Sequence, residues 1–373
     1  MRKHLVLVGG GHAHMKTLEN INRFIEKGYK VTVIGPSFHH YYSGMGPGML
    51  GGTYTPDQIR FATKKVVDKQ GGIFVKDYVV RIDPDEKQVF TLSGHEFSYD
   101  VLSFNAGSQV PMTSAPQGAK NIYPVKPIEK LMQASDQLKL LFQEKACTIS
   151  VVGGGPSSAE VAGNVWQLAR TTKGYGPKIR IFAGKKFMAR FPDSIRHRIL
   201  TVFRQREIEV IETGYVKALT ENAVTLETGE VFATDFVFMA LGVKPSGIFA
   251  ASGLPTGPDQ GLRVNKYLQS VAYPDIFGGG DCIYFEDQPL DKVGVYAVRE
   301  NPVLLHNLMA ALEGKDLQAF DPGSDYLLIF NLGGGLGLLR KNRLVFGGRI
   351  AFWIKDYIDR RFIEKFQAIE KPL

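Results

Sequence analysis

Cysteine is scarce in this chain of 373 residues, because only Cys147 and Cys282 are present. Two thiols exclude a disulfide framework and a four-cysteine metal or iron–sulfur site. Neither belongs to a Cys-x-x-Cys arrangement, so we interpret both as buried structural thiols. No apolar run reaches the roughly 18 residues that a membrane-spanning helix needs. The N-terminal residues 1–3 lead directly into an apolar β-branched stretch, which predicts a cytoplasmic protein without a signal peptide.

An excess of acidic charge is also missing. The net charge is +8, and the segment 340–373, with nine bases and four acids, carries +5 of it. The remainder of the chain is nearly balanced, which argues against a nucleic-acid-binding surface. The length fits two to three domains, each with its own core.

Two glycine fingerprints lie far apart in the chain. The first is Gly9-Gly10-Gly11-His12-Ala13-His14, and the second is Gly153-Gly154-Gly155-Pro156-Ser157-Ser158-Ala159-Glu160. Each follows a short apolar β-branched stretch and precedes a helical pattern. This context is what a pyrophosphate site at a helix N-terminus requires, so the sequence predicts two dinucleotide sites.

Alternating strand and helix patterns surround both fingerprints. We expect a helix over 15–27, strands over 30–34 and 99–105, and a second βαβ unit over 148–183. Prolines between 111 and 127 indicate a domain boundary there. The rest predicts hairpins over 209–238, a helix over 296–312, and a terminal module with a hairpin over 327–346 followed by a helix. The fold class is therefore α/β with two Rossmann-like, glutathione-reductase-type domains and a small C-terminal module.

Several segments together resemble a known family. They are Gly9–His14, Tyr42-Ser43-Gly44-Met45-Gly46-Pro47-Gly48, Tyr99–Ser103, Gly279-Gly280-Asp281 and Gly294-Val295-Tyr296-Ala297-Val298-Arg299-Glu300. With them the chain resembles the two-dinucleotide-binding-domain flavoproteins of the pyridine nucleotide-disulfide oxidoreductase superfamily. Within that superfamily it is similar to the membrane-associated type II NADH dehydrogenases, and more closely to the flavoprotein module fused to selenide, water dikinase.

The resemblance implies FAD as cofactor and NADH or NADPH as electron donor. The FAD-binding domain would comprise 1–113 and 242–320, the NAD(P)H-binding domain 114–241, and the C-terminal module 321–373. Glycines admit backbone close to phosphate, and one carboxylate accepts hydrogen bonds from sugar hydroxyls. The cofactor-binding residues that the resemblance implies in the discontinuous domain and at its border are Gly9, Gly11, His12, Ala13, Ser43, Pro47, Val80, Ala106, Gly107, Gly242, Gly280, Asp281 and Ala297.

The first fingerprint departs from the family pattern in two places. His14 stands where the third glycine is expected, so helix–strand packing must accommodate a larger side chain. Ile34 is followed by Gly35-Pro36-Ser37, without the carboxylate that usually binds the adenosine ribose. We therefore expect a different ribose contact and a replaceable flavin.

The second fingerprint predicts binding of the nicotinamide coenzyme by Gly153, Gly155, Pro156 and Ser157. By resemblance, Glu160 points toward the nicotinamide; a carboxylate stabilised by the helix dipole is the alternative. The next strand is followed by Ala183-Gly184-Lys185-Lys186. Lys185 and its neighbour favour the 2′-phosphate of NADPH, although a solvated surface pair explains them equally well.

The last helix decides the expected electron acceptor. Its apolar positions form one face, with Ile350, Trp353, Ile354, Tyr357, Ile358 and Phe362 at helical spacing. Arg349, Lys355, Arg360 and Lys365 are expected to flank that face. This composition predicts that residues 349–367 lie in a membrane interface, whereas docking on the body or a homodimer contact are the alternatives.

From these features we predict a peripheral membrane NAD(P)H:quinone oxidoreductase at the cytoplasmic membrane. Its catalytic candidates are Glu160, Tyr296 and Arg299, although the helix that carries the last two residues can also be explained by packing alone. A soluble reductase of an acidic electron-carrier protein is one alternative function. A non-catalytic flavin-binding redox sensor is the other.

Overall fold

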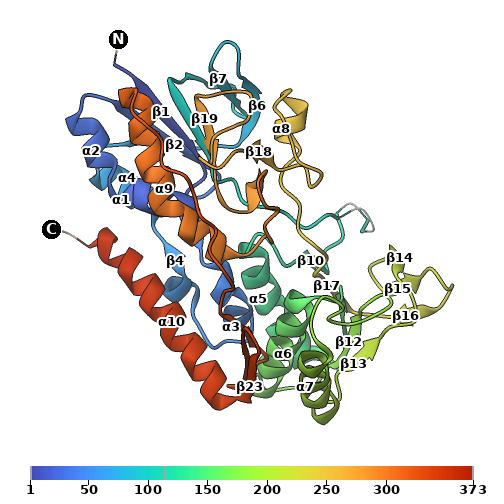
Figure 1. Ribbon diagram of the computed structural model, residues 1–373. Coiled ribbons are helices and arrows are strands. Elements are labelled where there is room, and N and C mark those ends of the chain that lie inside the picture. The colour runs from blue at the N-terminus through green and yellow to red at the C-terminus, as the bar shows by residue number, and fades with distance from the viewer. Residues whose placement is uncertain (1, 113–114, 117, 372–373) are drawn as a thin grey trace.

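Two five-stranded parallel sheets form the frame of the molecule (Figure 1). The computed structural model describes residues 2–112, 115–116 and 118–371. The first sheet consists, in spatial order, of β19 (Ile276–Gly278), β9 (Val101–Phe104), β1 (His4–Val8), β2 (Lys30–Gly35) and β5 (Ile73–Lys76). The second consists of β10 (Ile122–Pro124), β17 (Phe236–Met239), β11 (Thr148–Val152), β12 (Lys178–Phe182) and β13 (Glu209–Ile211). Both central strands, β1 and β11, are almost fully buried, as their continuous apolar runs predict.

Helices cover both sheets, and two of the predicted elements differ from the structure. The helix expected over 15–27 is divided into α1 (Met15–Glu19) and α2 (Ile21–Glu26). Asn20 interrupts it. The side-chain amide of Asn20 donates to the carbonyl oxygen of Lys16 at 2.8 Å and so takes the acceptor that the backbone amide of Asn20 would use in a continuous helix. The segment 209–238 is not hairpins throughout, since β13 and β17 belong to the second sheet. The remaining helices of these two layers are α3 (Gly46–Leu50), α4 (Thr63–Lys69), α5 (Glu129–Glu144), α6 (Pro156–Thr171), α7 (Asp193–Gln205), α8 (Ile248–Ala251) and α9 (Gly294–Glu313).

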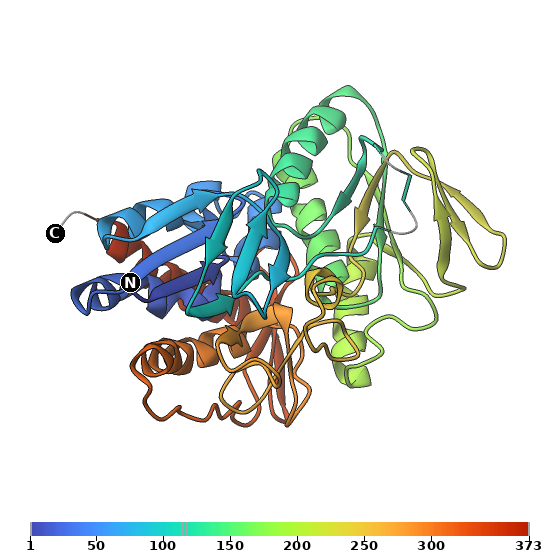
Figure 2. The ribbon, with the colours of Figure 1, turned by 90° about the horizontal axis from the view of Figure 1, so that it is seen from above.

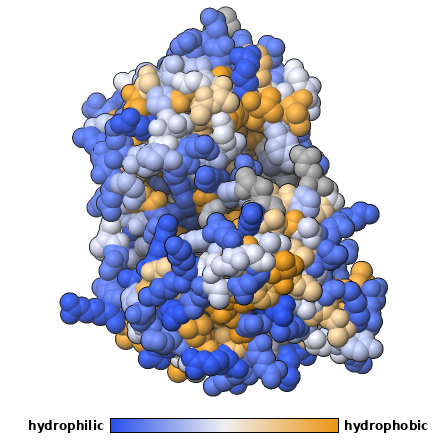
Figure 3. Space-filling model, turned by 90° about the vertical axis from the view of Figure 1, so that its right-hand side faces the viewer, coloured by the Kyte–Doolittle hydropathy of each residue, from blue (hydrophilic) through white to orange (hydrophobic). Residues whose placement is uncertain are grey.

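Each half also contains a small, separate antiparallel sheet, and Figure 2 shows the two halves side by side. Their strands are β6 (Val79–Asp83), β7 (Gln88–Thr91) and β8 (Glu96–Ser98) in the first half, and β14 (Val216–Leu219), β15 (Ala223–Leu226) and β16 (Val231–Ala233) in the second. Two strand pairs complete the first half: β3 (His40–Tyr41) with β4 (Arg60–Phe61), and β18 (Leu262–Val264) with β20 (Ile283–Phe285). On the side of the molecule that carries β14–β16, the surface is hollowed between the two halves (Figure 3).

The C-terminal module joins the two halves. A three-stranded antiparallel sheet of β21 (Leu328–Asn331), β22 (Gly337–Lys341) and β23 (Leu344–Gly348) leads into α10 (Arg349–Gln367). In Figure 1 α10 runs from the helices of the second sheet to those of the first. Residues of this module and of the segment around α3 share one hydrophobic core with the second sheet, whereas the first sheet has its own core.

The strands of each parallel sheet come from separate ranges of the chain. All five strands of the first sheet lie within 1–113 and 242–320, and all five of the second lie within 114–241. We therefore propose these ranges as the two dinucleotide-binding domains; the boundary between 113 and 114 itself lies outside the described residues. Over the described part of the chain, the structure has no helix of the length and apolarity that crossing a membrane requires.

Candidate functional site

The first glycine turn is packed tightly against Asn105, at the end of β9. Gly9 has a φ of +88°, and a Cβ there would lie 2.2 Å from the carbonyl oxygen of Asn105. A Cβ on Gly11 would lie 2.2 Å from Asn105 Oδ1, which accepts a hydrogen bond from the backbone of Ala13 at 3.2 Å. Asn105 Nδ2 donates to Gly279 at 2.7 Å. Asn105, which the sequence analysis did not single out, thus connects both glycine segments of the first domain.

His14 replaces the third glycine without opening the helix–strand contact. Its imidazole is fully buried, with Nδ1 2.7 Å from the carbonyl oxygen of Gly9 and Nε2 2.8 Å from Ser103 Oγ. Burial lowers the pKa of His14 to about 4, so the ring is neutral. One nitrogen donates and the other accepts, which satisfies both polar atoms of the buried ring.

Asp281 lies just after β19, where its carboxylate receives two donors. Lys126 Nζ is 2.6 Å and Ser108 Oγ 2.7 Å from Oδ2, which leaves Oδ1 without a hydrogen-bond partner in the described structure. Burial raises the pKa of Asp281, but Lys126 outweighs this effect and the pKa is lowered. The anionic carboxylate can therefore still accept from a sugar hydroxyl. Lys126 was not predicted, because 155 positions separate it from Asp281.

Glu300, on α9, holds the backbone beside Asp281. Its Oε2 accepts from the amide of Gly280 at 2.5 Å, and the side chain is 1% exposed. Burial raises the pKa of Glu300 to about 7. This residue ends a segment that was quoted for the family resemblance, but no role was predicted for it. Ala297, one turn earlier on the same helix, lies beside Gly280.

The first domain also contains features that fit a bound FAD. A Cβ on Gly107, whose φ is +68°, would meet no atom within 4 Å, so backbone there can approach a ligand. His12 is buried, and its Nε2 has no hydrogen-bond partner within the described chain. Burial lowers the pKa of His12 to about 3. Its ring stacks on Phe362 of α10, with centroids 5.5 Å apart.

The other predicted residues of the first domain are dispersed. Pro47 is buried in α3, and Ser43 is partly exposed in the turn before it. Val80 lies on β6 with 48% of its side chain exposed, and no contact places it at the glycine turn. Gly242 follows β17, where a Cβ would meet no atom within 4 Å. Ala106 directly follows Asn105 and is exposed.

The second glycine turn leaves open space at the start of α6. Gly153 has a φ of +140°, and a Cβ there would lie 2.2 Å from the carbonyl oxygen of Ala240. A Cβ on Gly155 would meet nothing within 4 Å. Pro156 opens α6 and Ser157 is exposed beside it. Because the start of this 16-residue helix is open at Gly155, its N-terminus can bind a pyrophosphate.

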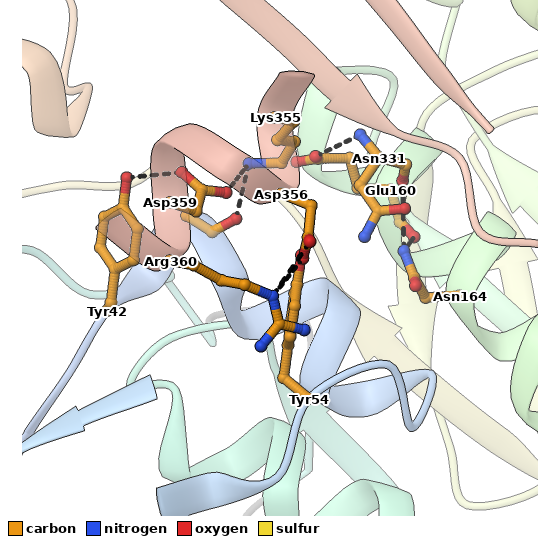
Figure 4. Close-up of polar contacts among 10 residues, drawn as sticks. Tyr42, Tyr54, Glu160, Asn164, Asn331, Lys355, Asp356, Asp359 and Arg360 are labelled. Carbon is orange, nitrogen blue, oxygen red and sulfur yellow. Dashed lines mark hydrogen bonds and ion pairs between the residues drawn. The ribbon is translucent and has the colours of Figure 1, made fainter. Parts of the chain in front are cut away.

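Glu160 lies in the second turn of α6 and contacts the C-terminal module. Its Oε1 accepts from the backbone amide of Asn331 at 2.8 Å, and Asn164 Nδ2 donates to the carbonyl of Asn331 at 3.1 Å (Figure 4). Burial raises the pKa of Glu160 to about 6, although the positive charge of Lys355 opposes this effect. Glu160 is therefore held in place by β21 and titrates close to neutral pH.

The inner face of α10 contains an ion pair, which corrects one prediction. Lys355 does not flank the exposed apolar face: it is 9% exposed, and its Nζ lies 2.7 Å from Asp359 Oδ2 and 2.9 Å from the carbonyl oxygen of Gly44. Tyr42 donates to Asp359 Oδ1 at 3.0 Å (Figure 4). Burial lowers the pKa of Lys355, but Asp359 and Glu160 outweigh it and raise the pKa. The pairing explains why a lysine is stable on a buried face.

A second polar cluster on α10 consists of Asp356, Arg360 and their partner Tyr54. Arg360 Nε donates to both oxygens of Asp356, at 2.9 and 3.0 Å, and Tyr54 donates to Asp356 Oδ1 at 2.8 Å. Burial raises the pKa of the Tyr54 hydroxyl. These contacts, together with the Lys355 pair, connect α10 to the segment around α3.

Tyr296 and Arg299 have different surroundings, although both lie on α9. Tyr296 lines a small cavity together with Asp281 and Glu300. Arg299 donates to the carbonyl oxygens of Pro322 and Ser324, in the connection to the C-terminal module. A role for either residue in catalysis stays a prediction.

Cys147 and Cys282 are both buried free thiols. Burial raises the pKa of Cys147 to about 11 and that of Cys282 to about 12. The predicted burial of both thiols is confirmed, and neither has the lowered pKa of a reactive cysteine.

Comparisons with known proteins agree with this geometry. The model of the pyridine nucleotide-disulphide oxidoreductase family matches residues 3–308. A type II NADH:quinone oxidoreductase of Staphylococcus saprophyticus is 25% identical over 99% of this chain and 97% of its own length. An assimilatory nitrate reductase electron transfer subunit of Bacillus subtilis is 27% identical over 75% of this chain and 36% of its own length.

The fold has solved counterparts as well. The structure of NDH2 from Plasmodium falciparum in complex with NADH superposes with a TM-score of 0.80 at 15% identity, covering 99% of this chain and 98% of that one. The family match spans most of the chain and includes both glycine turns. The chain therefore belongs to the pyridine nucleotide-disulphide oxidoreductase family and is an FAD-dependent oxidoreductase of pyridine nucleotides.

Proposed function

We propose that the protein oxidises a reduced nicotinamide coenzyme and reduces a quinone at a membrane surface. FAD, when bound, supplies the chemistry that accepts a hydride and passes on two electrons. Each quinone that becomes a quinol takes up two electrons and two protons; the coenzyme supplies a hydride, so one proton comes from elsewhere. The chain's own residues must hold that proton and position the acceptor.

Glu160 is suited to hold this proton. Its pKa of about 6 lies close to neutral pH, so the carboxyl group can both take up and release a proton under these conditions. The backbone amide of Asn331 fixes one carboxylate oxygen at 2.8 Å, and the charge of Lys355 acts on the same carboxylate. The Glu160 carboxyl group therefore has a fixed position at the junction of α6, β21 and α10, and its charge changes with pH.

The exposed apolar residues on the outer face of α10 support the proposed binding to a membrane. Four large apolar side chains are strongly exposed there: Ile350 (69%), Trp353 (72%), Tyr357 (57%) and Ile358 (43%). Arg349, Arg361 and Lys365 are exposed on the same helix. Tryptophan, tyrosine and bases around an apolar face are typical of a helix that lies in a membrane interface. Each base near an anionic leaflet contributes on the order of 1 kcal/mol.

The two faces of α10 thus serve different purposes. On its inner face the positive charge of Lys355 acts on the Glu160 carboxylate, and its outer face is apolar and exposed. An acceptor dissolved in the bilayer would meet the protein at this helix. A quinone fits both faces, because it is lipid-soluble and needs protons when reduced.

The experiment combines turnover with vesicle binding. The FAD-loaded protein is mixed with NADH or NADPH and a soluble quinone, and coenzyme oxidation is followed. Binding to vesicles that contain anionic lipid is measured for the wild type, Trp353→Glu and, as control, Leu92→Glu, which changes an equally exposed residue elsewhere. We expect turnover with at least one coenzyme and at least ~10-fold weaker vesicle binding for Trp353→Glu only. Absence of turnover with both coenzymes contradicts the quinone proposal.

A reductase of an electron-carrier protein is the second candidate. The exposed bases of α10 favour it, because they could dock an acidic carrier. The relative from Bacillus subtilis is named as an electron transfer subunit. Turnover that depends steeply on salt, requires a carrier protein and is indifferent to vesicles would support this candidate. The redox-sensor alternative and the resemblance to the module fused to selenide, water dikinase stay predictions; a flavin that neither coenzyme bleaches would favour the sensor.

A further inference from the structure

The loop after β12 lies directly against the second glycine turn. The amide of Met188 donates to the carbonyl of Gly154 at 2.7 Å, and a Cβ on Gly154 would lie 2.6 Å from the carbonyl oxygen of Ala183. In dinucleotide-binding domains, the residue at the end of this strand faces the adenosine ribose of the coenzyme. Residues that follow Ala183 are therefore placed to contact the ribose 2′ position.

Carboxylates near this position are already engaged. Ala183 stands where an acidic side chain would accept from the ribose hydroxyls of NADH. Asp193, the first acid that follows, pairs with Lys186 at 3.0 Å. Glu212, at the end of the neighbouring β13, accepts from Arg196 at 2.7 and 3.0 Å and from the amide of Phe187 at 2.5 Å. Both carboxylates are therefore already balanced by basic groups, so neither should repel a phosphate.

Bases in the same loop remain available. Lys185 and Arg190 are both exposed, and within the described residues neither has an ion-pair partner within 4.0 Å. Gly184, just before Lys185, has a φ of +72°, and a Cβ there would lie 2.5 Å from the ring of Tyr215. The turn from which Lys185 projects is therefore fixed by packing, and its ammonium is free to bind an anion.

We propose that Lys185 binds the 2′-phosphate of NADPH, so that the protein uses NADPH in preference to NADH. A phosphate monoester carries about −1.5 to −2 charges near neutral pH, and lysine binds it as a point charge. NADH brings only hydroxyls to this position, where the two nearby carboxylates that the structure describes are already paired. The inference rests on the use of a reduced nicotinamide coenzyme and is independent of the electron acceptor.

The experiment compares two probes that differ in one phosphate. Calorimetry on the FAD-loaded protein measures the affinity for adenosine 2′,5′-bisphosphate and for adenosine 5′-monophosphate. We expect the bisphosphate to bind at least ~10-fold more tightly, Lys185→Glu to abolish that preference, and Lys185→Arg to retain it. Lys173→Glu is the matched control, because it makes the same charge change just beyond the opposite end of α6, roughly 24 Å away.

Equal affinity of the wild type for both probes overturns the inference, and so does an unchanged preference in Lys185→Glu. Ala183→Asp supplies a second measurement, since a carboxylate there should lower the NADPH-to-NADH ratio of flavin-reduction efficiencies by at least ~10-fold. Probe binding requires no electron transfer. If the bisphosphate preference is found but no quinone is reduced, the proposed function fails and this inference stands.

Discussion

The hydroxyl of Tyr42 donates to Asp359 Oδ1 across 3.0 Å, although 317 positions separate the two residues in the chain. The same carboxylate pairs through Oδ2 with Lys355, whose Nζ also reaches the carbonyl of Gly44. The hydrogen bond therefore fixes Asp359, the ion-pair partner of the buried Lys355, to the segment before α3 (Figure 4). The C-terminal helix is thus an integral part of the site around Glu160, and its inner contacts can be tested separately from its outer face.

Asp359→Asn should be strongly destabilising. The substitution leaves the buried ammonium of Lys355 without its ion-pair partner, and we expect the free energy of unfolding to fall by about 3–5 kcal/mol. Denaturant unfolding of the FAD-loaded protein measures the change. Asp68→Asn is the control: it breaks an exposed pair with Lys64 at the same i, i+4 spacing and should cost less than ~1 kcal/mol. Similar losses in the two variants would show that Lys355 is not held as the geometry indicates.

Glu160→Gln should change how quinone reduction depends on pH. In the wild type the carboxyl, with a pKa of about 6, is protonated below that pH, so activity that needs its proton falls as pH rises through 6. The amide keeps the acceptor for Asn331 but cannot transfer a proton; we expect a rate loss of about 100-fold and no inflection near 6. Stopped-flow reduction of the flavin by coenzyme serves as control and should be preserved. The same inflection in the variant would assign the titration to another group.

The sequence could predict features that depend on residues close together in the chain, but not contacts between residues far apart in the chain. The strands and glycine turns around Gly9 and Gly153 follow from patterns within about ten residues. The amphipathic pattern of the last helix predicted an exposed face around Trp353, but it assigned Lys355 to the solvent. Burial of that lysine depends on Tyr42 and Gly44, which only the tertiary structure brings there.

The residues around Asp281 illustrate the same limit. Lys126 and Asp281 form an ion pair across 155 positions, and a single sequence contains no signal for such a pairing. Glu300 lies in a helix where a glutamate is ordinarily solvent-exposed. Its burial follows from the close approach of the Gly280 amide, which depends on how α9 docks against β19.

Glu300→Gln should become stabilising as pH rises. Burial raises the pKa of Glu300 to about 7 from 4.5, so the folded state holds this proton more tightly than the unfolded state. Below pH 4.5 the carboxyl is neutral in both states; between 4.5 and 7 the wild type loses stability relative to the variant, by up to about 3 kcal/mol. The amide oxygen can still accept from Gly280. Unfolding free energies of both proteins at about pH 5 and about pH 8 measure the difference, and a gap that does not widen with pH contradicts the assignment.

His14→Gly restores the common fingerprint, yet it should destabilise the protein. The imidazole is fully buried and bonded to Gly9 and Ser103, so its removal leaves a cavity, an unpaired carbonyl and an unpaired hydroxyl. We expect the free energy of unfolding to fall by about 3 kcal/mol or more. Ser158→Gly makes the corresponding change in the second fingerprint, where the buried hydroxyl has no hydrogen-bond partner in the described chain, and should cost less than ~1.5 kcal/mol. Equal stability of the two variants would contradict this role of the imidazole, whereas the predicted gap supports His14 as a buried bridge between the first glycine turn and β9.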